Sequence, residues 1–358
     1  MATSPTYEKE LLVAQLAVQR ATLLTKRVFH QKVKGTTSKD DKSPVTIGDY
    51  GAQALIIHAI KTNFPDDEIV AEEEASSLRE DKSLAEQIWG FVKETKLDDA
   101  ESESLIGGPI KDEEEMLTRI DQGGSAGGAS GRIWALDPID GTKGFLRGGQ
   151  YAVCLGLMVD GDVKVGAIGC PNLPVDDSAP LDADIGKDAT DEGDSRGVLF
   201  SAVQGHGAKS AHLAKGKLNP AHPISMKKIT DLSNATFCES VEAAHSAHGD
   251  QAEIAKKLGT TKASVRMDSQ AKYCSIARGA GDIYLRLPVK KDYQEKIWDH
   301  AAGDLIVREA GGEVTDSEGK RLDFSKGRTL SHNKGVVAAP SAIHPKVIEV
   351  VKSVLGSK

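Results

Sequence analysis

The pattern of apolar and polar positions predicts two helices in the first sixty residues. Five apolar residues recur near the amino terminus at alternating spacings of three and four, which is typical of one helical face: Ala14, Ala17, Ala21, Leu24 and Val28. Ser4 and Pro5 precede this face and suit the N-cap and first turn of a long helix. After the polar run TTSKDDKSP, the apolar run AQALIIHAI predicts a second helix that begins at or just after Asp49. The helix dipole would favour a carboxylate at that position.

Short apolar runs that end in acidic turns predict strands. DEIVAEEE (67–74) and RIWALDPIDGT (132–142) share this design, and two apolar arms around Asp160-Gly161 predict a tight antiparallel hairpin. Residues 75–131, with an acidic stretch and the glycine-rich run QGGSAGGASG, are expected to form a mobile insertion over a helical segment. The acidic residues 176–194 superficially resemble a calcium loop, but a loop begun at Asp182 lacks the final glutamate, so we expect a solvated surface loop.

The pattern changes near residues 205–215. Beyond that point short strands alternate with helices: the strands are ATFCESV, DIYLRLP and GVVAAP, and the helices are QAEIAKKL and HAAGDLIVREA. Alternation of this kind is typical of α/β structure, whereas the preceding part mixes helices with antiparallel strands. We therefore predict an α+β domain over 1–209 followed by a smaller α/β domain over 210–358.

Composition and charge exclude several classes of protein. The chain has 358 residues, 39% of them hydrophobic, which is enough to bury a sizeable core. Its formal net charge is −8, so it has no global field to attract nucleic acid, although a local pocket of cations could hold a nucleotide-sized anion. The four cysteines show no metal-binding spacing and predict buried free thiols. With no apolar leader or membrane span in the sequence, we expect a cytoplasmic protein and a monomer, without a nucleic-acid or membrane partner.

The segment Asp137–Thr142, DPIDGT, carries the strongest candidate chemistry. It offers two carboxylates three residues apart, a turn set by proline, and a glycine–threonine pair whose backbone N–H groups can face an anion. Neither His nor Cys occurs in this turn or among residues 72–74, and ligands that are all oxygen suit magnesium better than zinc. Taken alone, the same residues would also form an ordinary β-turn.

Two other acidic segments are expected to meet this turn. Glu72, Glu73 and Glu74 end a strand in the same way, and strand ends gather at one edge of a sheet, where ligands usually bind. In KIWDHAAG, residues 296–303, Asp299 opens a helix whose small residues permit close backbone approach, although a plain N-cap would look similar. The sequence contains neither a Walker loop nor a GxSxG elbow, so it supports neither a P-loop nucleotidase nor a serine hydrolase.

In order from Asp49 to Gly303, these segments resemble the magnesium-dependent, lithium-sensitive phosphatases of the inositol monophosphatase superfamily. Within it, longer runs are similar to the 3′(2′),5′-bisphosphate nucleotidases, especially the fungal ones: SPVTIGDYGAQ, DPIDGTKGFLRGGQYAVCL, GCPNL, DSQAKY, YLRLP and YQEKIWDHAAG. The likeness is weakest over 75–131 and 172–196, and Ala71 stands where that family usually has glycine. The resemblance implies a layered αβαβα sandwich of the inositol monophosphatase and fructose-1,6-bisphosphatase type.

The resemblance also implies roles for individual residues. Two or three magnesium ions would be held by one set of ligands: Glu72, Asp137, the Ile139 carbonyl, Asp140 and Asp299. Asp49 with Thr142, assisted by Glu72, would orient and deprotonate the water that attacks the phosphate, without a covalent phospho-enzyme. Contacts to the substrate would come from a second set: Thr142, His245, Ser269, Lys272, Arg286 and Asp299. By themselves, Lys272 could equally be a solvated helix residue and His245 a helix cap.

The substrate that the resemblance implies is 3′-phosphoadenosine 5′-phosphate, cleaved to AMP and phosphate, with its 5′-phosphosulfate analogue as a second substrate. Lithium would inhibit by taking one magnesium position, and the physiological role would be removal of a by-product of sulfate assimilation, linked to salt tolerance. Two alternatives stay open. One is a phosphatase of the same superfamily that acts on inositol phosphates or sugar bisphosphates, and the other is a non-catalytic nucleotide sensor.

Overall fold

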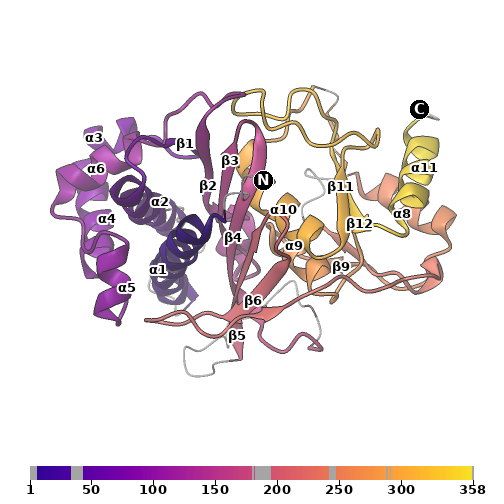
Figure 1. Cartoon of the computed structure of the whole chain (residues 1–358), viewed down its shortest axis with the longest axis horizontal. Coiled ribbons are helices and arrows are strands. Elements are labelled where there is room, and N and C mark those ends of the chain that lie inside the picture. Colours follow the sequence, from indigo (N-terminus) through magenta and orange to yellow (C-terminus); the bar gives the residue numbers. More distant parts are fainter. Residues whose placement is uncertain are drawn as a thin grey trace.

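Helices and two β-sheets alternate in five layers (Figure 1). The computed structural model describes residues 6–33, 43–179, 181, 195–241, 247–287, 289–290 and 292–356. In order, the layers are a pair of helices, a seven-stranded sheet, a second pair of helices, a five-stranded sheet and a third pair of helices, and further helices lie outside the first pair. The αβαβα sandwich predicted from the sequence is confirmed.

The first layer consists of α1 (Glu8–Val33) and α2 (Ser43–Asn63). The five residues predicted to form one face of α1 are between 0 and 3% exposed, which confirms that face, while the proposed cap at 4–5 lies outside the described residues. The predicted start of the second helix is wrong, because α2 begins six residues before Asp49. Pro44 falls in its first turn, where a proline is tolerated, and the helix therefore continues through the polar residues ahead of the apolar run.

The strands of the seven-stranded sheet lie side by side in their chain order. Its strands are β1 (Glu68–Ala71), β2 (Arg132–Asp140), β3 (Ala152–Val159), β4 (Asp162–Pro174), β5 (Arg196–Val203), β6 (Ala208–His212) and β7 (His222–Pro223). Only β1 and β2 are parallel, and every other pair is antiparallel. Asp160 and Gly161 have φ of 51° and 78°, the left-handed turn that a two-residue hairpin needs, so the predicted hairpin is confirmed.

The segment between β1 and β2 is helical, as predicted, and covers the outer side of α2. It contains α3 (Ser76–Glu80), α4 (Lys82–Glu94), α5 (Ala100–Leu105) and α6 (Glu113–Asp121). The glycine-rich run that follows packs on the protein: Ser125 N–H donates to the Ile69 carbonyl at 3.0 Å, and Gly127 lies against the backbone of Gly327. The acidic loop expected at 176–194 lies largely outside the described residues.

The second sheet has the order β11-β12-β10-β8-β9. Its strands are β8 (Phe237–Glu239), β9 (Val265–Arg266), β10 (Ile283–Arg286), β11 (Gly312–Thr315) and β12 (Val336–Pro340). The remaining helices are α7 (Thr142–Arg147), η1 (Leu232–Asn234), α8 (His248–Leu258), α9 (Ala271–Ala277), η2 (Ile297–Asp299), α10 (Ala301–Glu309) and α11 (His344–Leu355). The predicted boundary at 209/210 falls inside β6, so the first sheet extends past it to Pro223.

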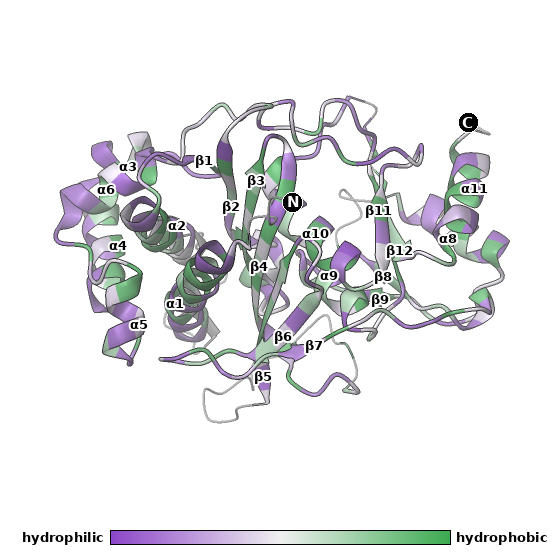
Figure 2. Ribbon diagram, viewed as in Figure 1, coloured by the Kyte–Doolittle hydropathy of each residue, from purple (hydrophilic) through white to green (hydrophobic). Residues whose placement is uncertain are grey.

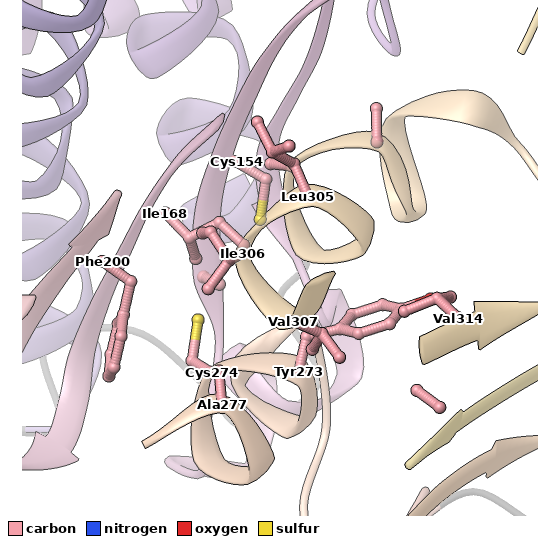
Figure 3. Packing of buried hydrophobic residues seen from close by; sticks show 14 of the residues in the cluster. Cys154, Ile168, Phe200, Tyr273, Cys274, Ala277, Leu305, Ile306, Val307 and Val314 are labelled. Carbon is pink, nitrogen blue, oxygen red and sulfur yellow. The ribbon is translucent and has the colours of Figure 1, made fainter. Parts of the chain in front are cut away.

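Helices α9 and α10 lie between the two sheets and bury the central core. Apolar residues are concentrated in the strands of the larger sheet, while the outer helices α3 and α6 are mainly polar (Figure 2). Cys154 and Cys274 pack with Ile168, Phe200 and Ile306 in this core (Figure 3). All four cysteines are buried free thiols, as predicted. Among the described residues, no helix combines the length and the hydropathy that crossing a bilayer requires.

Candidate functional site

One pocket of about 550 Å³ collects most of the predicted site residues. Its walls come from the ends of β1, β2 and β10, the start of α7, the turn before α9 and the short helix η2. The predicted residues that line it are Glu72, Asp137, Ile139, Asp140, Thr142, Ser269, Lys272, Arg286 and Asp299. Segments more than two hundred residues apart in the chain therefore meet at one place.

The parallel pairing of β1 with β2 brings the first two carboxylates together. Ala71 pairs with Leu136, so the next residues, Glu72 and Asp137, lie side by side, with Glu72 just past the end of β1 and Asp137 still within β2. Asp137 and Asp140 are three residues apart, so in a regular strand their side chains would point to opposite faces of the sheet. The register of β2 shifts between them, and both line the pocket.

The acidic residues perturb one another strongly. Burial, followed by the charges of Glu72, Asp140 and Asp299, raises the pKa of Asp137 well above its ordinary value. Glu72 is accessible to solvent at the mouth of the pocket, yet enclosure by protein atoms and the nearby Asp299, Glu73 and Asp140 raise its pKa to about 8. The pKa of Asp140 rises to about 6, first through burial and then through Asp299. Carboxylates this close are costly to ionise together without cations.

The site fits hard divalent cations. Oδ1 of Asp137 is buried and has no hydrogen-bond partner within the described part of the chain, although buried carboxylate oxygens are normally satisfied. The other ligand candidates nearby are the carboxylates of Glu72, Asp140 and Asp299 and the Ile139 carbonyl, all of them oxygen. Magnesium prefers such ligands.

Glycine lets α2 carry Asp49 up to this turn. A Cβ at Gly48 would lie only 2.6 Å from Cδ1 of Ile139, so the missing side chain permits the close approach. Asp49 is 6% exposed. Burial, then Glu73 and Glu72, raise its pKa well above the ordinary value, which places it among the same acidic residues.

Thr142 and Ser269 lie on two neighbouring turns of the pocket. Gly141 has φ of 86°, and α7 starts after it with Thr142, whose Oγ1 lies 3.5 Å from the Ile139 carbonyl. Ser269 also has a left-handed φ, 69°, and a Cβ on Gly141 would lie 2.9 Å from its Cβ. The two turns therefore pack closely only because residue 141 is glycine. His245, the remaining predicted contact, lies outside the described residues.

Two positively charged side chains, Lys272 and Arg286, line the pocket together with the acidic residues. Lys272 is 2% exposed, and its ammonium donates to the carbonyls of Met267 and Ser269 at 3.1 and 2.9 Å. It is thus a buried side chain and not the solvated helix residue considered as an alternative. Burial lowers its pKa to about 8, although Asp140 and Asp268 oppose the change.

Arg286 reaches from the end of β10 toward the acidic group. It makes ion pairs with Glu295 at 2.7 Å and Asp299 at 3.3 Å. Burial would lower the pKa of Arg286, but Glu295, Tyr284 and Asp299 outweigh burial and raise it. The guanidinium is therefore charged and partly exposed, and it lies beside the candidate ligand Asp299.

Several residues of the site were missed by the sequence analysis. Gln270 donates its backbone N–H to Asp140 at 2.5 Å, and its side chain links the Trp298 carbonyl to the Gly303 N–H, so it connects β2 with η2 and α10. The sequence held a signal for Gln270, because it lies inside DSQAKY, which was singled out only for its neighbours. Asp268, Ser240 and Tyr293 also line the pocket.

Glu295 is another residue near the pocket that the sequence analysis missed. It approaches Arg286 at 2.7 Å and His300 Nε2 at 3.1 Å, and His300 Nδ1 lies 2.8 Å from the Tyr273 hydroxyl. Glu295, Asp299 and His300 offer three ligand atoms within 4.8 Å of one another. Because Glu295 already makes an ion pair with Arg286 and lies within hydrogen-bond distance of His300 Nε2, these contacts account for the cluster without a metal.

Ala71 causes no strain where the resemblance led us to expect glycine. It is not among the residues with positive φ, and it is 1% exposed. Its carbonyl accepts a hydrogen bond from the Arg328 guanidinium at 2.6 Å, and its N–H donates to the Gly123 carbonyl at 2.9 Å. The methyl group packs near Gly123, where an added Cβ would approach it at 2.7 Å.

Known proteins resemble this chain in sequence and in fold. The inositol monophosphatase family matches residues 7–355. A 3′(2′),5′-bisphosphate nucleotidase of Emericella nidulans is 69% identical over 349 residues, covering 98% of this chain and 99% of that protein. A 3′(2′),5′-bisphosphate nucleotidase of Schizosaccharomyces pombe is 51% identical over 352 residues, covering 97% of this chain and 95% of that protein. The solved inositol monophosphatase from Anabaena shares the fold with a TM-score of 0.59 at 18% identity, covering 99% of this chain and 100% of its own. This chain belongs to the inositol monophosphatase family.

Proposed function

We propose that this protein hydrolyses the 3′-phosphate of 3′-phosphoadenosine 5′-phosphate to give AMP and inorganic phosphate, and that it also accepts the 5′-phosphosulfate analogue. One observation carries the proposal: a single pocket is lined both by carboxylates suited to cations and by the positively charged Lys272 and Arg286. A substrate with two phosphates can direct one toward the carboxylates and their cations and the other toward Lys272 and Arg286. The two fungal relatives named as 3′(2′),5′-bisphosphate nucleotidases support this choice.

Two or three magnesium ions are the proposed cofactors. Their ligands would be Glu72, Asp137, the Ile139 carbonyl, Asp140 and Asp299. When bound, they supply Lewis-acid charge at the phosphate that is cleaved. The orphaned Oδ1 of Asp137 and the mutually raised pKa values of the carboxylates support this assignment.

Asp49 and Thr142 are the proposed residues for handling the attacking water. The Asp49 carboxylate would accept its proton, and the Thr142 hydroxyl would orient it. The close packing of Gly48 on Ile139 supports this pairing, since it brings α2 to the turn that carries Thr142. Glu72, beside Asp49 at the mouth of the pocket, would assist.

Arg286, Lys272, Ser269 and His245 are the proposed nucleotide contacts. Arg286 would bind the retained 5′-phosphate, because its guanidinium is charged and faces the pocket. Lys272 would contribute its charge while its ammonium holds the turn of Ser269 in place. Four reduced thiols favour a cytoplasmic location. The monomeric state stays a prediction that analytical ultracentrifugation would test.

The test is release of inorganic phosphate from 3′-phosphoadenosine 5′-phosphate, inositol 1-phosphate and fructose 1,6-bisphosphate, each with and without magnesium. We expect magnesium-dependent release with a strong preference for the nucleotide. Preference for inositol 1-phosphate or the sugar bisphosphate would keep the cation site and refute the nucleotide contacts. Binding of the nucleotide with magnesium, and its recovery unaltered, would instead indicate a non-catalytic sensor.

A further inference from the structure

Arg328 lies outside the pocket but holds the end of β1. It belongs to the connection 316–335 between β11 and β12, which runs in yellow along the top of the molecule toward β1 (Figure 1). Its Nη2 donates to the Ala71 carbonyl at 2.6 Å, and its Nη1 donates to the Ser125 carbonyl at 2.9 Å. Ala71 is the last residue of β1 and directly precedes Glu72. The guanidinium therefore holds the main chain where the first carboxylate leaves the sheet.

The same guanidinium also packs on η2. Its Cζ lies 4.9 Å from the centroid of the Trp298 ring, and Trp298 directly precedes Asp299. The Arg328 carbonyl in turn accepts a hydrogen bond from Ile297 N–H at 3.2 Å. One residue thus links the two acidic segments, which lie more than two hundred positions apart in the chain.

The approach of this connection depends on two glycines. Gly127 has φ of 68°, and a Cβ there would lie 3.0 Å from the carbonyl carbon of Gly327. The glycine-rich run can therefore lie directly against the residue before Arg328. This packing gives the connection a defined place against the glycine-rich run.

Arginine suits this position better than lysine. A planar guanidinium can donate to two carbonyls and stack on a ring at the same time, whereas an ammonium is a compact point charge with no planar face.

We infer that Arg328 is a positioning residue of the cation site, which sets the separation of the Glu72 and Asp299 carboxylates and thereby the affinity for divalent cations. The inference rests on the proposed function, since it assigns those carboxylates to cations. Residues that orient metal ligands through such contacts typically change metal affinity by about 10- to 100-fold when they are replaced.

The experiment measures binding of Mn²⁺, used as a probe for magnesium, by isothermal titration calorimetry. The variants are Arg328→Lys and Arg328→Ala. We expect Arg328→Ala to weaken Mn²⁺ binding by about 10- to 100-fold and Arg328→Lys to recover part of the loss. At saturating cation, KM for the nucleotide should stay near that of the original protein, because Arg328 does not line the pocket.

Arg27 provides the matched control. Its Nη2 donates to the Phe91 carbonyl at 2.7 Å, and its Cζ lies 4.6 Å from the Phe91 ring, between α1 and α4. Arg27→Lys and Arg27→Ala should therefore lower stability to a similar extent without changing the affinity for Mn²⁺. They separate a loss of positioning from a general loss of stability.

Unchanged Mn²⁺ affinity in both Arg328 variants would overturn the inference, as would an equal loss of affinity in the Arg27 variants. Absence of Mn²⁺ binding to the original protein would overturn it together with the cation site. If the original protein binds Mn²⁺ but releases no phosphate from the nucleotide, the proposed function fails, and the comparison of affinities still decides the role of Arg328.

Discussion

Replacing Asp140 by asparagine should stabilise the cation-free protein at neutral pH while abolishing its activity. The folded protein raises the pKa of Asp140 from an ordinary 3.8 to about 6. A group with a raised pKa contributes stability below its unfolded pKa, and that contribution is lost as the pH rises through the folded pKa. The ionised carboxylate is therefore unfavourable in the folded protein above about pH 7.

The magnitude follows from the size of this shift. About two pKa units at about 1.4 kcal/mol per unit correspond to at most about 3 kcal/mol. Asparagine avoids this cost, and the weaker hydrogen bond that the N–H of Gln270 donates to a neutral oxygen needs no separate correction, because the shift already includes it. The expected gain is about 3 kcal/mol at about pH 7.5 and about 1 kcal/mol at about pH 4.5.

Urea denaturation in EDTA at both pH values measures the free energy of unfolding of the original protein and of Asp140→Asn. Magnesium should then stabilise the original protein strongly at the higher pH and the variant much less. Glu318→Gln is the control, because Lys320 and Lys334 lower the pKa of this exposed carboxylate to about 2 and its charge is favourable. The reasoning is refuted if Asp140→Asn is the less stable protein in EDTA at the higher pH.

Three further predictions concern the substrate, the cations and the packing. Arg286→Ala should raise KM for 3′-phosphoadenosine 5′-phosphate at least about tenfold and raise KM for 3′-AMP much less, because only the first substrate has a 5′-phosphate. Equal changes of KM for both substrates would contradict the proposed contact between Arg286 and the 5′-phosphate. Millimolar lithium should reduce phosphate release at limiting magnesium. Unchanged release would refute the proposed competition between lithium and magnesium for one cation position. Gly303→Ala should cost about 1 to 3 kcal/mol, measured by urea denaturation, because its Cβ would lie 2.3 Å from the Tyr273 ring. Gly90→Ala, in α4 with open space around it, should instead gain about 0.5 to 1 kcal/mol.

Local patterns predicted many of the individual helices and strands, whereas the layered sandwich was expected from the family resemblance. The spacing of apolar residues identified the face of α1, the hairpin at Asp160 was evident from its turn residues, and acidic runs marked the ends of β1 and β2. Each of these features depends on neighbours within a few residues, so sequence alone can reveal it. The start of α2 was missed because a polar first turn carries no apolar pattern, and the boundary near 209 was placed inside β6 because the last strands of the larger sheet are short.

The sequence by itself determined the ligand chemistry of the site: carboxylates and carbonyls without His or Cys, in an order that resembles one superfamily. Only the tertiary structure decided how these groups meet. It placed Asp49 inside α2, buried Lys272, paired Arg286 with Glu295, and brought Arg328 to the ends of both acidic segments. These arrangements depend on contacts between layers that are distant in the chain, and no periodicity within a single segment records which partner another layer will supply.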